Sequence, residues 1–449
     1  MARLTNIWEN LRTSFWFVPT LMVTGAILLL IFCIALDRTV ADHEKASPFV
    51  YVSTPGDARE VLATLLSSMI TMASLVFSVT MVVLSLAANQ FGPRLIRSFM
   101  ASPQTQTVLG AFVMTIVYCL LLLAKIGSRG GEVPTAYLSV TVALVLTLIS
   151  VGLLVFFIHT LARSIVSETV IARVGRELAG VLDGYGPCPE SVRPTPETHL
   201  PDRFNAEARF FGTEQAGYVQ AIEFDEIAAV AKEADVVVGL AFRSGDYVAH
   251  GGRTIGLWPA GRCDDRLTAA IQGAIVLGIQ RTPVQDIEFS IRHLVEIAVR
   301  ALSAGVNDPY TAAAAIDQLS ASLSRIMECD LPSGVHRDSD DQVRVVCPAP
   351  SYASLLGASF DQIRQNGVDK PMIAIRLIDA MARIGPHVRL PVQLDALGEQ
   401  LRIVAEAASR TVEDPSDQAD VARRVASART SLADAARALA HSDTEDAEN

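Results

Sequence analysis

Four long runs of apolar residues dominate the first third of the chain. Each run is uncharged over about 20 positions, the length that an α-helix needs to cross the hydrocarbon core of a bilayer. Because a charged side chain at the bilayer centre is costly, uncharged apolar runs of this length predict membrane-spanning helices. The four predicted spans cover residues 15–36, 61–90, 108–124 and 136–158.

The pattern of apolar and polar positions changes after residue 165. Residues 166–204 are polar and rich in proline, which predicts a connector along the surface. Residues 205–265 alternate between apolar and polar positions and contain glycine turns, which predicts a small β-module. Helical periodicity then resumes. It predicts a central helical pair over residues 266–330 and a C-terminal helical region over residues 331–441, before a disordered polar tail over residues 442–449.

The predicted fold class is therefore a membrane α-helical domain of four transmembrane helices, residues 1–165, joined to a cytoplasmic α+β domain. Charge follows the same division. Residues 1–158 hold 9 of the 37 Lys and Arg residues and 7 of the 48 Asp and Glu residues, which leaves 28 basic and 41 acidic residues in the rest of the chain. Binding to nucleic acid requires a cationic surface, so this acidic half argues against nucleic acid as its main partner.

Basic residues in the short flanks of the spans predict the orientation in the membrane. Seven lie on the side that carries both termini, and five lie on the opposite side. This bias predicts a multi-pass protein with both termini in the cytoplasm. The seven are Arg3, Arg12, Arg94, Arg97, Arg163, Arg173 and Arg176, and the five are Arg38, Lys45, Arg59, Lys125 and Arg129.

The second predicted span carries a stripe of small polar side chains on one helical face, because most of their spacings are three or four positions. Two interpretations are open. Small hydroxyl side chains let helices pack closely and bond across the seam, and weakly polar side chains also line channels in oligomers. The absence of charged residues within the spans argues against an active transporter. The stripe consists of Ser67, Thr71, Ser74, Ser78, Ser85 and Asn89.

The densest group of reactive side chains lies between residues 281 and 308. Thr282 and Pro283 predict the start of a helix that ends at Gly305, and Asp308 and Pro309 predict the cap and first residue of the next helix. We expect this group to form ion pairs and caps, or a surface that binds a small ligand or a protein partner. Metal binding by His293 and Glu296 is a weaker alternative. The candidate residues are Arg281, Gln285, Asp286, His293, Glu296, Arg300, Asn307 and Asp308.

No motif of a hydrolase, a zinc protease or a nucleotide-binding loop occurs in the sequence. The sequence therefore predicts no catalytic residues, no cofactor and no metal. The leading hypothesis is a homo-oligomeric pore in the lipid bilayer, lined by the second span and regulated by the cytoplasmic domain. The alternative is a membrane-anchored ligand-sensing or scaffolding protein without a conducting pore.

Several segments together resemble a bacterial family of predicted membrane proteins that carries domain of unknown function 2254. They are FWFVPTLM in the first span, SSMITMASLVFSVTMVVLSLAANQFGPRLI in the second, LGAFVMTIVYCLLLL in the third and RTPVQDIEFSIRHLVEIAVRALSAGVNDPYTA in the soluble half. The resemblance implies a location in the bacterial inner membrane and implies no activity. The residues that match the recurring soluble motif are Arg281, Gln285, Asp286, Asn307, Asp308 and Pro309.

Overall fold

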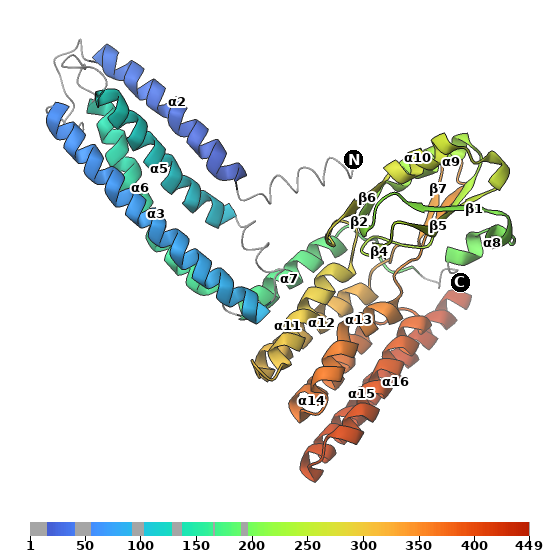
Figure 1. Cartoon of the computed structure of the whole chain (residues 1–449). Helices are drawn as coiled ribbons and strands as arrows, with labels where there is room; N and C mark the ends of the chain where they lie inside the picture. Colours follow the sequence, from blue (N-terminus) through green and yellow to red (C-terminus); the bar gives the residue numbers. More distant parts are fainter. Residues whose placement is uncertain are drawn as a thin grey trace. The chain divides into compact units, whose positions relative to one another are not determined.

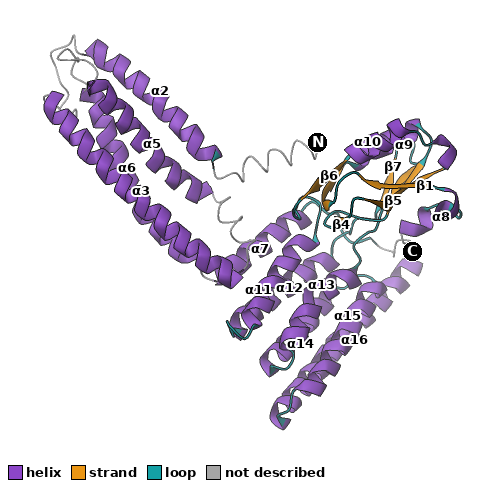
Figure 2. Cartoon of the chain, in the orientation of Figure 1, coloured by secondary structure: helices purple, strands orange, loops and turns teal. Residues whose placement is uncertain are grey.

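A computed structural model of the chain describes residues 16–40, 55–91, 103–127, 137–164, 167–189 and 196–448. The chain divides into two compact units, of which the first is Ile7–Val166 and the second is dominated by Ser167–Asn449. Figure 1 labels the helices and strands along the chain, and Figure 2 distinguishes the all-helical first unit from the mixed second unit.

Within the described residues, the first unit contains four helices that are long and apolar enough to cross a membrane. This confirms the prediction of four candidate spans. Each helix is longer than its predicted span, because the helical conformation continues into residues beyond the uninterrupted apolar run. The helices are α2 (Phe17–Val40), α3 (Pro55–Phe91), α5 (Pro103–Gly127) and α6 (Tyr137–Ser164).

Helix α5 is the most buried of the four and packs against α2, α3 and α6. Two apolar clusters hold the helices together, one around Tyr118 and the other around Phe112, and both of these side chains are fully buried. Many large apolar side chains of α2, α3 and α6 point outward instead. Such an outer surface is expected where the surrounding solvent is lipid rather than water.

The second unit begins with a helix that the sequence analysis did not predict. Helix α7 (Ser167–Leu182) occupies the first half of the predicted connector. Its buried face includes Val174 and Leu178, and it packs against helices α11 (Glu288–Leu302) and α12 (Pro309–Met327). The prediction of a surface connector is wrong for these residues, because the charged residues between the buried positions hid an amphipathic pattern.

Two small sheets follow. The five-stranded sheet has the strand order β1-β5-β3-β8-β7, with β3 and β8 parallel and the other pairs antiparallel; the three-stranded antiparallel sheet has the order β4-β2-β6. The strands are β1 (Arg209–Thr213), β2 (Gly217–Ile222), β3 (Val237–Leu240), β4 (Tyr247–Val248), β5 (Gly251–Trp258), β6 (Ile275–Gly278), β7 (Val335–Arg337) and β8 (Val343–Val346).

Three of these strands lie outside the predicted β-module. Strand β6 falls in the region predicted as a helical pair, and β7 and β8 fall in the region predicted as C-terminal helices. Val238 of β3 pairs with Val345 of β8, and both side chains are buried in one apolar core. The sequence analysis missed β8 because a four-residue apolar strand is too short for its periodicity to be distinguished from that of a helix.

Short helices accompany the sheets, and Figure 1 shows α9 and α10 lying over the strands. They are α8 (Phe204–Glu207), α9 (Phe224–Glu233) and α10 (Asp265–Gly273), together with the 3₁₀ turns η1 (Pro196–His199) and η2 (Ala260–Arg262). A third 3₁₀ turn, η3 (Gly385–His387), lies instead among the C-terminal helices.

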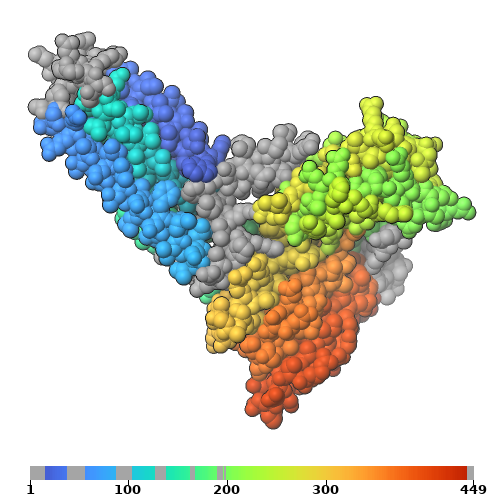
Figure 3. Space-filling view, viewed as in Figure 1, coloured from blue at the N-terminus to red at the C-terminus, as the bar shows by residue number. Residues whose placement is uncertain are grey.

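The remaining helices form antiparallel hairpins side by side. In the space-filling view their colours pass from yellow at α11 to red at α16 in chain order (Figure 3). The predicted helix start at Pro309 is confirmed, and three later helices also begin at a proline, at Pro371, Pro391 and Pro415. The last four helices are α13 (Tyr352–Gly367), α14 (Pro371–Ile384), α15 (Pro391–Thr411) and α16 (Pro415–Glu448).

Three helix boundaries differ from their predictions. Helix α11 covers Glu288–Leu302, whereas the prediction was a helix that starts at Pro283 and ends at Gly305. In the segment before Glu288, the side chain of Gln285 bonds to the backbone of β2. Helix α16 continues to Glu448, through residues expected to be disordered. Extending an existing helix costs less free energy than nucleating a new one, which favours this continuation.

Candidate functional site

A cavity of about 370 Å³ lies in the second unit, where the strands meet the start of α11. We call it the Asp286 cavity. The segment Val284–Glu288 forms one wall, and Tyr185, which follows α7, forms another. Side chains from the sheet region, including Arg243 and His336, complete the lining.

Asp286 is held in place by two donors. Nε of Arg281 donates to Oδ2 of Asp286 at 2.7 Å, and the backbone N–H of Glu288 donates to Oδ1 at 3.1 Å. The Asp286 side chain is only 3% exposed. Burial raises the pKa of this carboxyl above its usual range, and the neighbouring Arg281 guanidinium offsets part of that rise.

Gln285 attaches the same segment to the edge of β2. Its Oε1 accepts the backbone N–H of Ile222 at 2.9 Å, and its Nε2 donates to the carbonyl oxygen of Ile222 at 3.0 Å. The side-chain amide therefore satisfies both backbone groups of a strand residue, as a neighbouring strand would. This attachment explains why the segment before Glu288 is not helical.

Glu288 lies between two arginines. Arg243 forms an ion pair with Oε1, and Arg292 donates to Oε2 through Nη2 at 2.7 Å. Burial raises the pKa of Glu288, but the two guanidinium groups outweigh this effect and hold the pKa below its usual range. The Glu288 side chain is 4% exposed and that of Arg243 is 25% exposed. A molecule that enters the cavity therefore meets the positive charge of Arg243 rather than the buried carboxylates.

The opposite wall is largely apolar. The imidazole of His336 stacks on the ring of Phe224, with centroids 3.6 Å apart and planes 10° apart. Burial lowers the pKa of His336 to about 4, so the imidazole is neutral at pH 7. Burial also raises the pKa of Tyr185 and of the Cys347 thiol, so these groups are uncharged as well. Apolar walls with one accessible cation are typical of a site for a small amphipathic ligand.

The structure divides the eight candidate residues of the soluble half among several places. Gln285 and Asp286 line the cavity, and Arg281 reaches it through Asp286. Farther along α11, His293 is buried, and Arg300 pairs with Glu296 at 3.4 Å. Asn307 and Asp308 lie at the opposite end of α11, in its connection to α12.

That connection has a defined conformation. Oδ1 of Asp308 accepts the backbone N–H of Thr311 at 3.1 Å, which confirms the predicted cap of α12. The hydroxyl of Thr311 also donates to Oδ2 of Asp308 at 2.6 Å, and this bond, together with the backbone N–H groups, holds the pKa of Asp308 below its usual range. Asn307 has a φ of 48°, a left-handed conformation that asparagine tolerates better than most residues. The two residues therefore shape a turn.

The chemistry of a metal site is not assembled in the described part of the chain, where no three His, Cys, Asp or Glu side chains are grouped suitably. His293 and Glu296 thus have no third ligand of these types among the described residues.

Sequence reasoning missed Arg243, Glu288 and His336. Glu288 was within the discussed segment, but its predicted helical neighbours gave no reason to single it out. Arg243 precedes a turn at Ser244 and Gly245, and this position beside a glycine turn was the one local signal available. His336 had none, because its role depends on the pairing of β7 with a strand of the sheet.

The polar stripe of the second span lies on α3. Ser67, Thr71, Ser74, Ser78 and Ser85 are all exposed, whereas the side chain of Asn89 is outside the part that the structure describes. Oγ1 of Thr71 donates to the carbonyl oxygen of Ser67 at 3.0 Å. These exposed hydroxyls form no packing seam with the other helices that the structure describes in this unit.

Asp37 is a buried acidic residue that sequence reasoning did not select. It lies near the end of α2, and its carboxylate accepts the backbone N–H groups of Leu138 and Ser139, at 2.9 and 3.1 Å. The hydroxyl of Ser139 donates to the same carboxylate at 2.5 Å. The first candidate span therefore caps the beginning of the fourth, where free N–H groups favour a negative charge.

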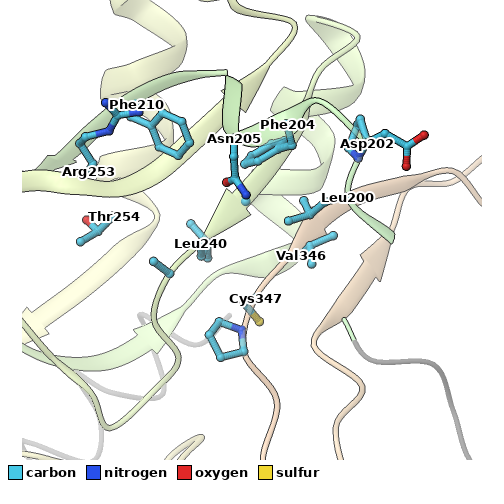
Figure 4. A pocket seen from close by; sticks show the side chains of 14 residues that line it. Leu200, Asp202, Phe204, Asn205, Phe210, Leu240, Arg253, Thr254, Val346 and Cys347 are labelled. Atoms are coloured by element: carbon cyan, nitrogen blue, oxygen red, sulfur yellow. The ribbon is translucent and has the colours of Figure 1, made fainter. Parts of the chain in front are cut away.

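A second cavity, of about 450 Å³, shares the lining residues Cys347 and Pro348 with the Asp286 cavity. Figure 4 shows Phe204 among its lining residues, with Asn205 beside it and Arg253 against Phe210. The Arg253 guanidinium carbon is 4.4 Å from the centre of the Phe210 ring. The polar side chains of Asp202, Asn205 and Arg253 are exposed, so the lining of this cavity is more polar than that of the Asp286 cavity.

These features define a membrane protein with four candidate spanning helices and a mixed α/β unit that contains a cavity with largely apolar walls. The chain belongs to the family described as "Predicted membrane protein (DUF2254)", which matches residues 12–383. It is 32% identical over 431 residues to the uncharacterized protein Rv1290c of Mycobacterium tuberculosis H37Rv, covering 94% of this chain and 81% of the relative. The uncharacterized protein Mb1321c of Mycobacterium bovis has the same identity and coverage. No solved structure matches the chain significantly.

Proposed function

We propose that this protein is a membrane-anchored sensor that binds a small amphipathic anion in the Asp286 cavity. The observation that carries the proposal is the cavity itself, with its apolar walls and the accessible guanidinium of Arg243. An apolar body of the ligand would contact Phe224, His336 and the neighbouring prolines. A carboxylate on the ligand would bond to the guanidinium, whose planar donors match that group.

Two helices connect the cavity to the chain that leaves the membrane. Tyr185 lines the cavity just after the end of α7, and α7 begins only three residues after Ser164, the last residue of α6. Helix α11 begins at the cavity wall and extends for 15 residues, or about 22 Å. Ligand binding that shifts these helices would move the start of α7. The short connection between α7 and α6 would pass this movement to the last candidate span, and that would be the signal.

The test compares three probes of similar shape and different charge: benzoate, benzyl alcohol and benzylamine. The full chain in lipid nanodiscs is titrated with each, and hydrogen exchange of the segment 284–288 is followed by mass spectrometry. We expect benzoate to slow exchange at millimolar concentration or below, and the neutral and cationic probes to act at least tenfold more weakly. Equal effects of the three probes would contradict a site selected by Arg243.

Variants localise the effect. Arg243→Gln is expected to remove the preference for benzoate, whereas Arg243→Lys retains charge and part of the preference. Arg337→Gln is the matched control, because Arg337 is exposed in β7 and its guanidinium bonds to Asp341 outside the cavity. Loss of benzoate selectivity in the control as well would argue against the Asp286 cavity.

A second candidate function is a homo-oligomeric pore, favoured by the exposed hydroxyls on α3. In this proposal the α3 helices of several subunits face a common pathway. Ser74→Leu and Ser78→Leu are then expected to reduce conductance in planar bilayers while the mass of the oligomer is unchanged. Met81→Leu, an exchange at another exposed position of α3, serves as the control. A monomeric particle without current would exclude the pore.

The proposed location is the bacterial inner membrane, with both termini and the second unit in the cytoplasm. The bias of basic residues in the flanks supports this orientation. A reporter fused after residue 449 tests it: a fluorescent protein that matures only in the cytoplasm should be bright, and alkaline phosphatase should be inactive. The opposite pair of results would reverse the orientation.

A further inference from the structure

The turn between α11 and α12 is well ordered and exposes apolar side chains. Tyr310 is 76% exposed and Val306 is 43% exposed. The turn is fixed by the hydrogen bonds of Asp308 to Thr311, and by the backbone N–H of Asp308, which donates to the carbonyl oxygen of Ala301 at 2.8 Å. An ordered turn that presents tyrosine and valine to its surroundings has an amphipathic surface suited to an interface between water and lipid.

Helices α7 and α12 run side by side in the same direction, which places this turn within the unit. Oγ1 of Thr311 donates to Oγ of Ser167 at 3.1 Å at one end. In the middle, a Cβ atom at Gly175 would lie 2.3 Å from the side chain of Gln318. At the other end, Arg325 pairs with Asp183 at 2.7 Å. The turn before α12 therefore lies beside the first residue of α7.

That first residue is tied closely to the last candidate span. The span ends at Leu161, helix α6 ends at Ser164, and Ser167 follows three residues later. Three residues of fully extended chain reach at most about 11 Å. Ser167, which bonds to Thr311 beside the turn, therefore follows the last residue of the fourth candidate span by only six positions in the chain.

We infer that the turn containing Val306 and Tyr310 lies in the headgroup layer of the lipid bilayer. Tyrosine is favoured at this depth because its ring is apolar and its hydroxyl remains hydrated. The turn would then be a second attachment of the soluble unit to the membrane, in addition to the covalent one. The inference does not depend on ligand binding in the Asp286 cavity.

The test measures the lipid contact of an added tryptophan in the full chain. Tyr310→Trp and Val306→Trp are each reconstituted in nanodiscs with and without phosphatidylcholine that carries a nitroxide on its headgroup, and the signal of the parent chain is subtracted. The matched control is Ile279→Trp, because Ile279 is 93% exposed and directly follows β6, outside the turn between α11 and α12.

We expect the nitroxide lipid to quench the added fluorescence of the Tyr310→Trp chain at least twofold more strongly than that of the Ile279→Trp chain. Val306→Trp should agree, and it replaces Tyr310→Trp if that variant does not fold. Equal quenching at both ends overturns the inference. Protection of the turn tryptophan from both the nitroxide lipid and aqueous acrylamide also overturns it, because a protein partner would then cover the turn.

Discussion

Gly245 lies directly against the carboxylate of Asp286. A Cβ atom at Gly245 would come within 2.4 Å of Oδ2 of Asp286 and within 2.6 Å of Nη2 of Arg281. The φ of Gly245 is 91°, a conformation that side chains rarely adopt. The turn that covers the buried ion pair therefore requires a residue without a side chain.

Gly245→Ala is expected to lower the free energy of unfolding by about 2–4 kcal/mol, because backbone strain and displacement of the ion pair add together. Gly251→Ala is the control. Its φ is 71°, but a Cβ atom there would have no neighbour within 4 Å, so only the strain of about 1 kcal/mol is expected. Thermal unfolding of the two variants in detergent measures the difference. Equal melting temperatures would show that contact with Asp286 is unimportant.

Gln285→Ala should destabilise the second unit by about 1–3 kcal/mol, because it leaves both backbone groups of Ile222 without their partner. The expected signature is faster hydrogen exchange at the end of β2. Gln215→Ala, at an exposed position between β1 and β2, is expected to change neither quantity. Unchanged exchange at Ile222 in the Gln285 variant would contradict the role assigned to its amide.

His336 makes stability depend on pH. Its pKa is about 4 in the folded chain and 6.5 ordinarily, so between these values the unfolded chain binds a proton that the folded chain does not. Stability from this residue is therefore fully present above pH 6.5 and falls as the pH decreases toward 4, by at most about 3 kcal/mol. His336→Phe keeps an aromatic ring beside Phe224 and should reduce the loss of melting temperature between pH 6.5 and 4.5. His250→Gln, at an exposed histidine, should leave that loss unchanged.

Asp37→Ala should weaken the association of α2 with α6 by about 1–3 kcal/mol, because two N–H groups and a hydroxyl lose their acceptor. Asp37→Asn retains an acceptor and should be less harmful. The melting temperature of the full chain in mild detergent gives the order of the three proteins. Glu60→Ala, at an exposed acid on α3, is the control. Equal stability of the Asp37→Ala and Glu60→Ala chains would rule out a cap between the two helices.

The features that sequence predicted well have local causes. Uncharged apolar runs are sufficient to identify α2, α3, α5 and α6, and proline after a capping residue is sufficient to start α12 at Pro309. The Asp286 cavity could not be predicted in the same way. Arg243, Glu288 and His336 are far apart in sequence, and they meet only after the sheet and the helices have packed together.

Helix α7 was missed for a different reason. Its apolar positions repeat correctly for a helix, but they are diluted by Arg173, Arg176 and Glu177 and followed by a proline-rich stretch. The hydrophobicity averaged over the whole predicted connector is therefore typical of a loop. The buried face becomes recognisable only once α11 and α12 supply the surface that it covers.

The pairing of β3 with β8 joins strands that are far apart in the sequence, so the five-stranded sheet can close only late in the synthesis of the chain. A ribosome completes Val238 long before Val345, so the five-stranded sheet stays open while the intervening helices α10, α11 and α12 emerge. The four apolar helices have left the ribosome by then and are available for insertion. The sheet can therefore close only after β8 has emerged, and a chain that stops before Val343 leaves this edge of β3 without its partner strand.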